Sequence, residues 1–178
     1  MPGGIDGSSH AGAEDRIMFD SLIALPLTLA ALGAGLMAGV YFAFSTFIMR
    51  AFDRLGAVQA ADAMNAINEE ILRSWFMVIF FGSTLLYATL AGIAVFDTDL
   101  AGRWWLFAAG LIYVVGMFLC TALFNVPLNN HLAAAAAGSA RGETWQHYFV
   151  NWTRWNHLRT LCSLVTAAIS IQYLVSQA

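Results

Sequence analysis

Charged residues are confined to four short segments of this chain, and this pattern limits its possible folds more than any other feature. Asp, Glu and Arg occur only within 6–20, 50–73, 97–103 and 141–159. The windows between them carry no charged side chain, and they are 21–49, 74–96, 104–140 and 160–178. Because a helix crosses roughly 30 Å of hydrocarbon with about 20 apolar residues, each window predicts one transmembrane helix.

The predicted fold class is all-α, a four-helix transmembrane bundle with spans of about 21–49, 74–96, 104–126 and 157–176. We expect one membrane domain over 21–178, preceded by a disordered, Gly- and Ser-rich tail over 1–20. Only 11% of the residues are charged, against about 25% in soluble domains, which disfavours a soluble bundle. A signal peptide in the first window is a weaker alternative, because its apolar run is too long.

The composition also disfavours several functions. A net charge of −3 without any lysine gives no basic surface for nucleic acid. Cys120 and Cys162 lie in apolar stretches, without the spacing of a zinc site or a disulfide scaffold. No phosphate-binding loop, dinucleotide fingerprint or serine-nucleophile motif occurs either. The sequence therefore predicts no metal centre and no nucleotide cofactor.

The arginines predict the orientation of the bundle. The tail and the second loop carry Arg16 and Arg103, and the other six lie in the first and third loops: Arg50, Arg54, Arg73, Arg141, Arg154 and Arg159. By the positive-inside rule, we expect the first and third loops to be cytoplasmic and both termini to lie outside. The expected location is the bacterial inner (plasma) membrane.

Two further segments have a helical pattern with a consequence for packing. Apolar residues within 57–73 recur at spacings near three and four, which predicts an amphipathic helix at the cytoplasmic interface. In the first window small residues recur every fourth position: Ala31, Gly35, Gly39 and Ala43. Such a stripe predicts a helix-packing face, with a homo-oligomer through Gly35 and Gly39 as one use of it. The alternative is the wall of a ligand cavity.

Polar and aromatic residues crowd into 125–159, where an ordinary membrane loop needs few of them. Asn125 and Asn129 are four residues apart and face the same way if the third helix continues. Pro127 lies between them and predicts a kink, with Asn side chains or water satisfying the freed carbonyls. A helix that simply ends in Asn caps is the alternative.

The approach to the fourth span carries a second polar stripe. Trp145, Trp152, Asn156 and Arg159 are separated by seven, four and three residues, and Tyr148 and Trp155 flank them. This spacing places them on one helix face. An interfacial aromatic belt with a snorkelling arginine would show the same pattern. Polar groups that face the bundle interior are, however, functional candidates, so we interpret the stripe as part of a ligand site.

Three sequence motifs resemble one family. They are GVYFAFSTFIMRAF in the first span, FNVPLNNHLA after the third, and W-x-x-W-N-H-L-R-T entering the fourth. They are similar to those of the anthrone oxygenase-like family of small four-helix integral membrane proteins, many of whose bacterial members are catalogued as domain of unknown function 1772. The resemblance extends over roughly 22–175.

The resemblance implies an oxidoreductase, an oxygenase that acts with O2 on a flat, apolar, phenolic or anthrone-like molecule without an evident cofactor. From residue chemistry we expect the pocket at the cytoplasmic end of the bundle. The predicted base is His157 or His131, and the predicted oxyanion donors are Arg159, Asn125, Asn129 and Asn156. The predicted substrate wall is Trp152 and Trp155, together with Tyr148 and Trp145.

Two other functions stay open at this point. A haem- or quinone-binding redox protein would use His131 and His157 as ligands from facing helices. A non-catalytic membrane assembly protein would use the G-x-x-x-G face and the tryptophans for partners alone. A carrier or channel is disfavoured, because the polar residues gather at one end of the spans.

Overall fold

The computed structural model describes residues 7–135 and 139–177, and in them the chain is all-α. The helices in chain order are α1 (Gly7–Ala43), α2 (Met49–Asp53), α3 (Ala57–Ile71), α4 (Trp75–Phe96), α5 (Arg103–Tyr113), α6 (Val126–Ala134) and α7 (Ser139–Gln177). Four continuous helical stretches are long and apolar enough to cross a membrane: Leu22–Asp53, Trp75–Phe96, Arg103–Ala134 and Gly142–Gln177. The predicted fold class is confirmed to that extent.

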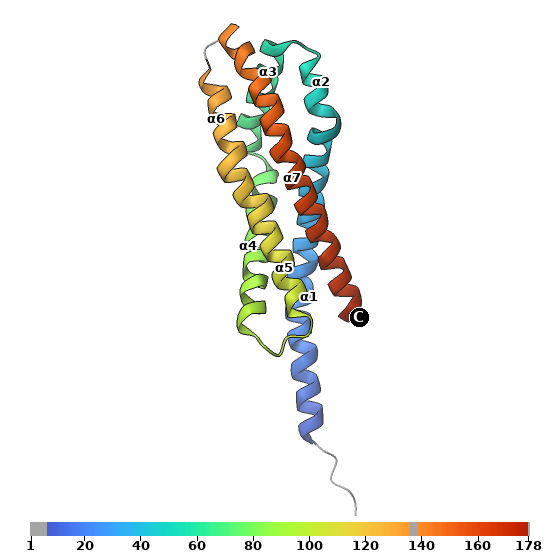
Figure 1. Cartoon of the computed structure of the whole chain (residues 1–178). Coiled ribbons are helices and arrows are strands. Elements are labelled where there is room, and N and C mark those ends of the chain that lie inside the picture. The colour runs from blue at the N-terminus through green and yellow to red at the C-terminus, as the bar shows by residue number, and fades with distance from the viewer. Residues whose placement is uncertain (1–6, 136–138, 178) are drawn as a thin grey trace, which may run out of the picture.

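Figure 1 shows α1, α4, α5 and α7 side by side, with α1 and α5 each packed against both α4 and α7. α2, α3 and the start of α7 gather at one end, and the C-terminus lies toward the other end with the α4–α5 turn. α1 begins at Gly7, within the stretch predicted as a tail, and residues 1–6 lie outside the described part of the chain. The tail itself stays a prediction.

Within the described part of the chain, three π-helical segments interrupt the long helices. They are η1 (Phe44–Ile48), η2 (Val114–Leu119) and η3 (Thr121–Asn125). The third helix does not end at Pro127, because η3 passes directly into α6 with the proline in its first turn. A local change of helix type is one of the ways in which a helix accommodates a proline. Single π turns inside α-helices are frequent at functional sites.

α3 is the helix that the sequence predicted over 57–73, and it packs on α7 and α6. It begins after Gly56, whose φ of 93° is in the left-handed region that favours glycine. Its buried residues Ala60, Ala61 and Met64 belong to one cluster with Trp145 and Trp152 of α7. The apolar face of α3 is therefore covered by protein.

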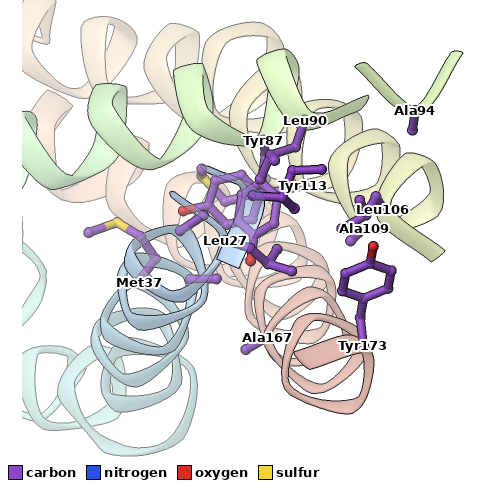
Figure 2. Packing of buried hydrophobic residues seen from close by; sticks show 14 of the residues in the cluster. Leu27, Met37, Tyr87, Leu90, Ala94, Leu106, Ala109, Tyr113, Ala167 and Tyr173 are labelled. Atoms are coloured by element: carbon purple, nitrogen blue, oxygen red, sulfur yellow. The ribbon is translucent and has the colours of Figure 1, made fainter. Parts of the chain in front are cut away.

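The hydrophobic side chains described as buried form two clusters, one toward each end of the bundle. The larger one joins α1, α4, α5 and α7, and Figure 2 shows Tyr87, Tyr113 and Leu27 packed at its centre. The smaller one joins α2, α3, α6 and α7 around Trp145 and Trp152. The division of the core leaves room between the clusters, and the cavity described below lies there.

The glycines at close helix contacts are not those of the small-residue stripe predicted in the first span. A Cβ built at Gly110 would lie 2.5 Å from the carbonyl oxygen of Tyr87, and one at Gly116 would overlap the Cys162 sulfur. Nothing lies within 4 Å of such an atom at Gly35 or Gly39. The small residues that bring α4, α5 and α7 together are thus on α5 and η2. The oligomer contact through the first helix stays a prediction.

Gly110→Ala should therefore destabilise the fold more than Gly35→Ala. The new methyl group at position 110 must push α5 away from α4, and we expect this to lower the free energy of unfolding by about 1–3 kcal/mol. Gly35→Ala is the matched control, because alanine favours the helix and meets open space. Equal effects in a detergent unfolding titration would contradict the packing described here.

Candidate functional site

A cavity of about 440 Å³ lies between the two core clusters. This volume is within the range of pockets that hold drug-sized ligands, about 300–1,000 Å³. Its aromatic lining is Phe44, Phe76, Phe80, Phe81, Phe118 and Trp152, and its polar lining is Tyr41, Asn65, Asn68, Glu69, Thr121, Asn129, Asn130 and Arg159. The cavity suits a flat aromatic molecule that carries a few polar atoms.

Arg159 of α7 places a charged group against this apolar space, and the side chain is only 4% exposed. Its terminal nitrogens donate to Thr121 Oγ1 at 3.3 Å and to Asn156 Oδ1 at 2.7 Å. The guanidinium carbon lies 4.3 Å from the ring centroid of Tyr41 and 5.0 Å from that of Trp152. Both distances are in the range of cation–π attraction.

The charge of Arg159 has no counter-ion among the described residues. The ionisable groups that act on it are Tyr41, Cys120 and Tyr148, and none of them is a carboxylate. Its Nε atom is buried without a hydrogen-bond partner. Because a buried cation is costly when nothing neutralises it, this arrangement favours an anionic or strongly polar ligand atom at the guanidinium.

Asn156 holds the guanidinium in position. The Asn156 side-chain nitrogen donates to the carbonyl oxygen of Tyr41 and to Ser45 Oγ, both at 2.7 Å. These two bonds fix the amide so that its oxygen faces Arg159, and the residue is fully buried. The π-helical segment η1 contributes Ser45, so the wider turn there provides a partner for α7.

Asn125 and Trp152 link the third and fourth long helices. The Asn125 side-chain nitrogen donates to the carbonyl oxygen of Trp152 at 3.3 Å, so this asparagine does not cap its own helix. The Trp152 ring lies 5.6 Å from that of Phe44, centroid to centroid, and lines the cavity. Its indole Nε1 is buried without a hydrogen-bond partner.

The remaining predicted residues of this end have structural contacts. The Tyr148 hydroxyl donates to Asn129 Oδ1 at 2.9 Å, which joins α7 to a residue of the cavity lining. The Trp145 indole donates to Asp53 Oδ1 at 2.8 Å, which joins α7 to α2. Trp145 is fully buried in the smaller core cluster and does not line the cavity.

Trp155 and the histidines lie outside the cavity lining. Trp155 stacks on Phe124 with ring centroids 3.8 Å apart. His131 and His157 are exposed, and neither is among the lining residues. His147 is also exposed, with its ring centroid 6.5 Å from that of His131. Among residues 7–135 and 139–177, no group of three or more His, Cys, Asp or Glu side chains is arranged to hold a metal ion.

Sequence reasoning missed several lining residues on other helices. Tyr41 of α1, Thr121 of η3 and the α3 pair Asn65 and Asn68 all face the cavity. The signal for the α3 pair was available, because the two amides are three residues apart and share a helix face next to Met64. The signal for Tyr41 was absent, since a tyrosine in a span is usually core.

The chain matches a known protein family. The family model described as anthrone oxygenase matches residues 73–169, which is more than half of the chain. The match begins just before α4 and includes Asn125, Trp152, Asn156 and Arg159. It confirms the family resemblance that the motifs indicated. No curated protein and no solved structure matches the chain significantly.

Proposed function

This chain belongs to the anthrone oxygenase family, and on that premise we propose that it is a membrane-embedded oxygenase. It uses O2 to oxidise a flat, weakly acidic, anthrone-like ketone held in the cavity beside Arg159. One observation carries the proposal: a guanidinium without a counter-ion among the described residues lines an aromatic cavity.

The proposed chemistry starts with deprotonation of the substrate. An anthrone can lose a proton from the CH2 carbon opposite its carbonyl to hydroxide or a buffer base of the medium, which gives an aromatic enolate. Arg159 is the proposed donor for the enolate oxygen, and the Trp152 ring is part of the wall beside it. Stabilisation of the developing charge by such preorganised donors is a large catalytic effect. The aromatic lining excludes water, which strengthens the attraction between the cation and the enolate.

Oxidation then follows from the reactivity of the enolate itself. The enolate carbon passes one electron to O2, and the resulting carbon radical and superoxide combine into a peroxide anion. This anion takes up a proton. The carbon then loses its second hydrogen as a proton while the O–O bond breaks and water leaves. A CH2 group and O2 thereby become a C=O group and one water molecule.

The proposed location is the plasma membrane, with the four long helices as spans and α3 at the cytoplasmic interface. Support comes from three arginines at the α2 and α3 end of the bundle: Arg50 lies within α2, Arg54 follows α2, and Arg73 follows α3. In this orientation both termini lie outside, and the substrate reaches the cavity from the cytoplasmic leaflet. Small apolar molecules, O2 and lipid are the proposed partners.

Oxygen uptake by the purified protein with a panel of anthrones and quinols tests this function. We expect uptake with anthrones, with one molecule of O2 consumed for each anthraquinone formed. No uptake with any member of the panel would contradict the oxygenase. An absorption spectrum of the same preparation tests the haem alternative, which requires a Soret band that shifts on reduction.

His157→Ala and His131→Ala test the histidine bases predicted from the sequence. Both imidazoles are exposed and outside the cavity lining, so we expect each variant to keep kcat/KM within about threefold of the parent. A general base contributes about 10²–10⁴-fold. A loss of that size in either variant would assign the base to that histidine and would show that its ring turns into the cavity during turnover.

A further inference from the structure

Three buried aromatic side chains of α7 form a stacked column that starts at the cavity. Trp145, Tyr148 and Trp152 are spaced by three and four residues, which places them on one helix face. The ring centroids of Trp152 and Tyr148 are 6.0 Å apart, and those of Tyr148 and Trp145 are 5.7 Å apart. Trp152 lines the cavity, and Trp145 lies seven residues earlier, about 10 Å along the helix axis. Continuous ring contacts therefore join the cavity to the α2 end of the bundle.

The two ends of this column have neighbours of opposite charge. At the cavity end, the guanidinium carbon of Arg159 lies 5.0 Å from the ring centroid of Trp152. At the other end, the Trp145 indole donates to Asp53 Oδ1 at 2.8 Å, and Gln146 donates to the same oxygen at 3.3 Å. Asp53 belongs to α2 and is half-buried. Because like charges repel and opposite charges attract, a positive charge on the column is more stable on Trp145 than on Trp152.

The three rings also differ in whether they can lose a proton. An indole that has lost one electron becomes a strong acid, and the N–H of Trp145 already points at a carboxylate. The Trp152 N–H has no hydrogen-bond partner. The Tyr148 hydroxyl donates to the side-chain oxygen of Asn129, and a neutral amide is not a base at this pH. Trp145 is therefore the ring at which a radical loses its proton and becomes neutral.

We propose that this column is an electron-transfer path that removes strong oxidants from the cavity, with Trp145 and Asp53 as its end. The inference rests on the proposed function, which forms a peroxide in the cavity beside Trp152, and it adds a second function to that site. The path protects the residues of the cavity when the peroxide breaks in the wrong way. The ring of Tyr148 conducts the electron between the two tryptophans.

The electrons and protons of this side reaction balance. Homolysis of the O–O bond in the protonated peroxide gives an alkoxyl radical and a hydroxyl radical. Each takes one electron from Trp152, and they become an alkoxide and a hydroxide ion. Each time, Trp152 regains its electron from Trp145 through Tyr148, and the Trp145 N–H passes its proton to Asp53. A soluble thiolate then returns the electron and Asp53 returns the proton, and two thiyl radicals combine into a disulfide.

Flash photolysis of the purified protein with 9,10-anthraquinone tests the path. The light-excited quinone takes one electron from a neighbouring indole and becomes a semiquinone, so it replaces the alkoxyl radical as oxidant. The neutral tryptophanyl radical and the tryptophan radical cation absorb at different wavelengths. We expect the parent to form equal amounts of semiquinone and neutral tryptophanyl radical. Trp145→Phe and Asp53→Asn should lose the neutral radical and show only a short-lived radical cation.

Two variants are the matched controls. Trp104→Phe removes an exposed tryptophan at the other end of the bundle, and Glu143→Gln neutralises an exposed carboxylate of α7. Both should give the neutral radical of the parent. Asp53→Asn keeps a hydrogen-bond acceptor for Trp145, so it tests the path even if Trp145→Phe does not fold.

An undiminished neutral radical in both Trp145→Phe and Asp53→Asn would overturn the proposal, as would a parent that forms no radical. Oxygen uptake with anthrones is decided separately. Uptake without a radical on Trp145 would refute the electron path alone, and the radical without uptake would refute the oxygenase alone.

Discussion

Arg159→Met should lower kcat/KM for anthrone oxidation by about 10²–10³-fold. The expected size is that of losing one preorganised donor for a developing oxyanion, and here the variant also removes a positive charge from the cavity lining. The methionine side chain has a similar length and is apolar, so it suits a position that is only 4% exposed. Oxygen uptake at several anthrone concentrations measures the effect.

Arg154→Met is the matched control, because Arg154 is an exposed arginine on the same helix. We expect this variant to retain the activity of the parent. The kcat/KM of Arg159→Lys should lie between those of Arg159→Met and Arg154→Met, since an ammonium keeps the charge but loses the planar fork of donors. Arg159→Met with parental activity would show that the guanidinium does not act on the substrate.

Asn156→Asp should strongly reduce turnover, and it also removes the hydrogen bond that the amide donates to the carbonyl oxygen of Tyr41. Asn156 Oδ1 already accepts from Arg159 at 2.7 Å, so a carboxylate of the same shape forms a buried ion pair with the guanidinium. The cation then has its counter-ion and no longer favours an enolate. We expect a loss of about 100-fold in kcat/KM, comparable with the removal of one oxyanion donor.

Asn151→Asp provides the same chemical change at a position where the side chain only donates to the carbonyl of His147. Its activity should remain close to that of the parent. Far-ultraviolet circular dichroism and size-exclusion chromatography in detergent establish that both variants are folded. An active Asn156→Asp variant would mean that neutralising Arg159 is harmless, which the proposed mechanism does not permit.

The fold could be predicted from the sequence because its strongest signal is local. Four uncharged windows predict four long helices through length and hydropathy alone. The contacts between helices were predicted less well. Gly35 and Gly39 form the visible repeat, but Gly110 and Gly116 make the close contacts. A small residue marks a contact only when another helix faces it, and the sequence does not say which faces meet.

In the candidate site too, the residues on one helix could be predicted and the contacts between helices could not. Trp152, Asn156 and Arg159 could be placed together because one helix sets their spacing. In the structure, Asn156 accepts a hydrogen bond from Arg159, and the Trp152 ring lies in cation–π contact with its guanidinium. His157 lies next to Asn156 in sequence, yet adjacent helix positions differ by about 100° in direction, and its side chain is exposed. Asn65 and Asn68 join the site only through the packing of α3.

The most direct test of the central claim is the ionisation state of bound anthrone in the absence of oxygen. Without O2 the reaction stops at the enolate, whose absorption differs from that of the ketone. We predict that the parent and Arg154→Met produce the enolate spectrum at a pH where free anthrone remains a ketone, and that Arg159→Met does not. Bound anthrone that stays a ketone in the parent, or an equal enolate signal in Arg159→Met, would contradict the account.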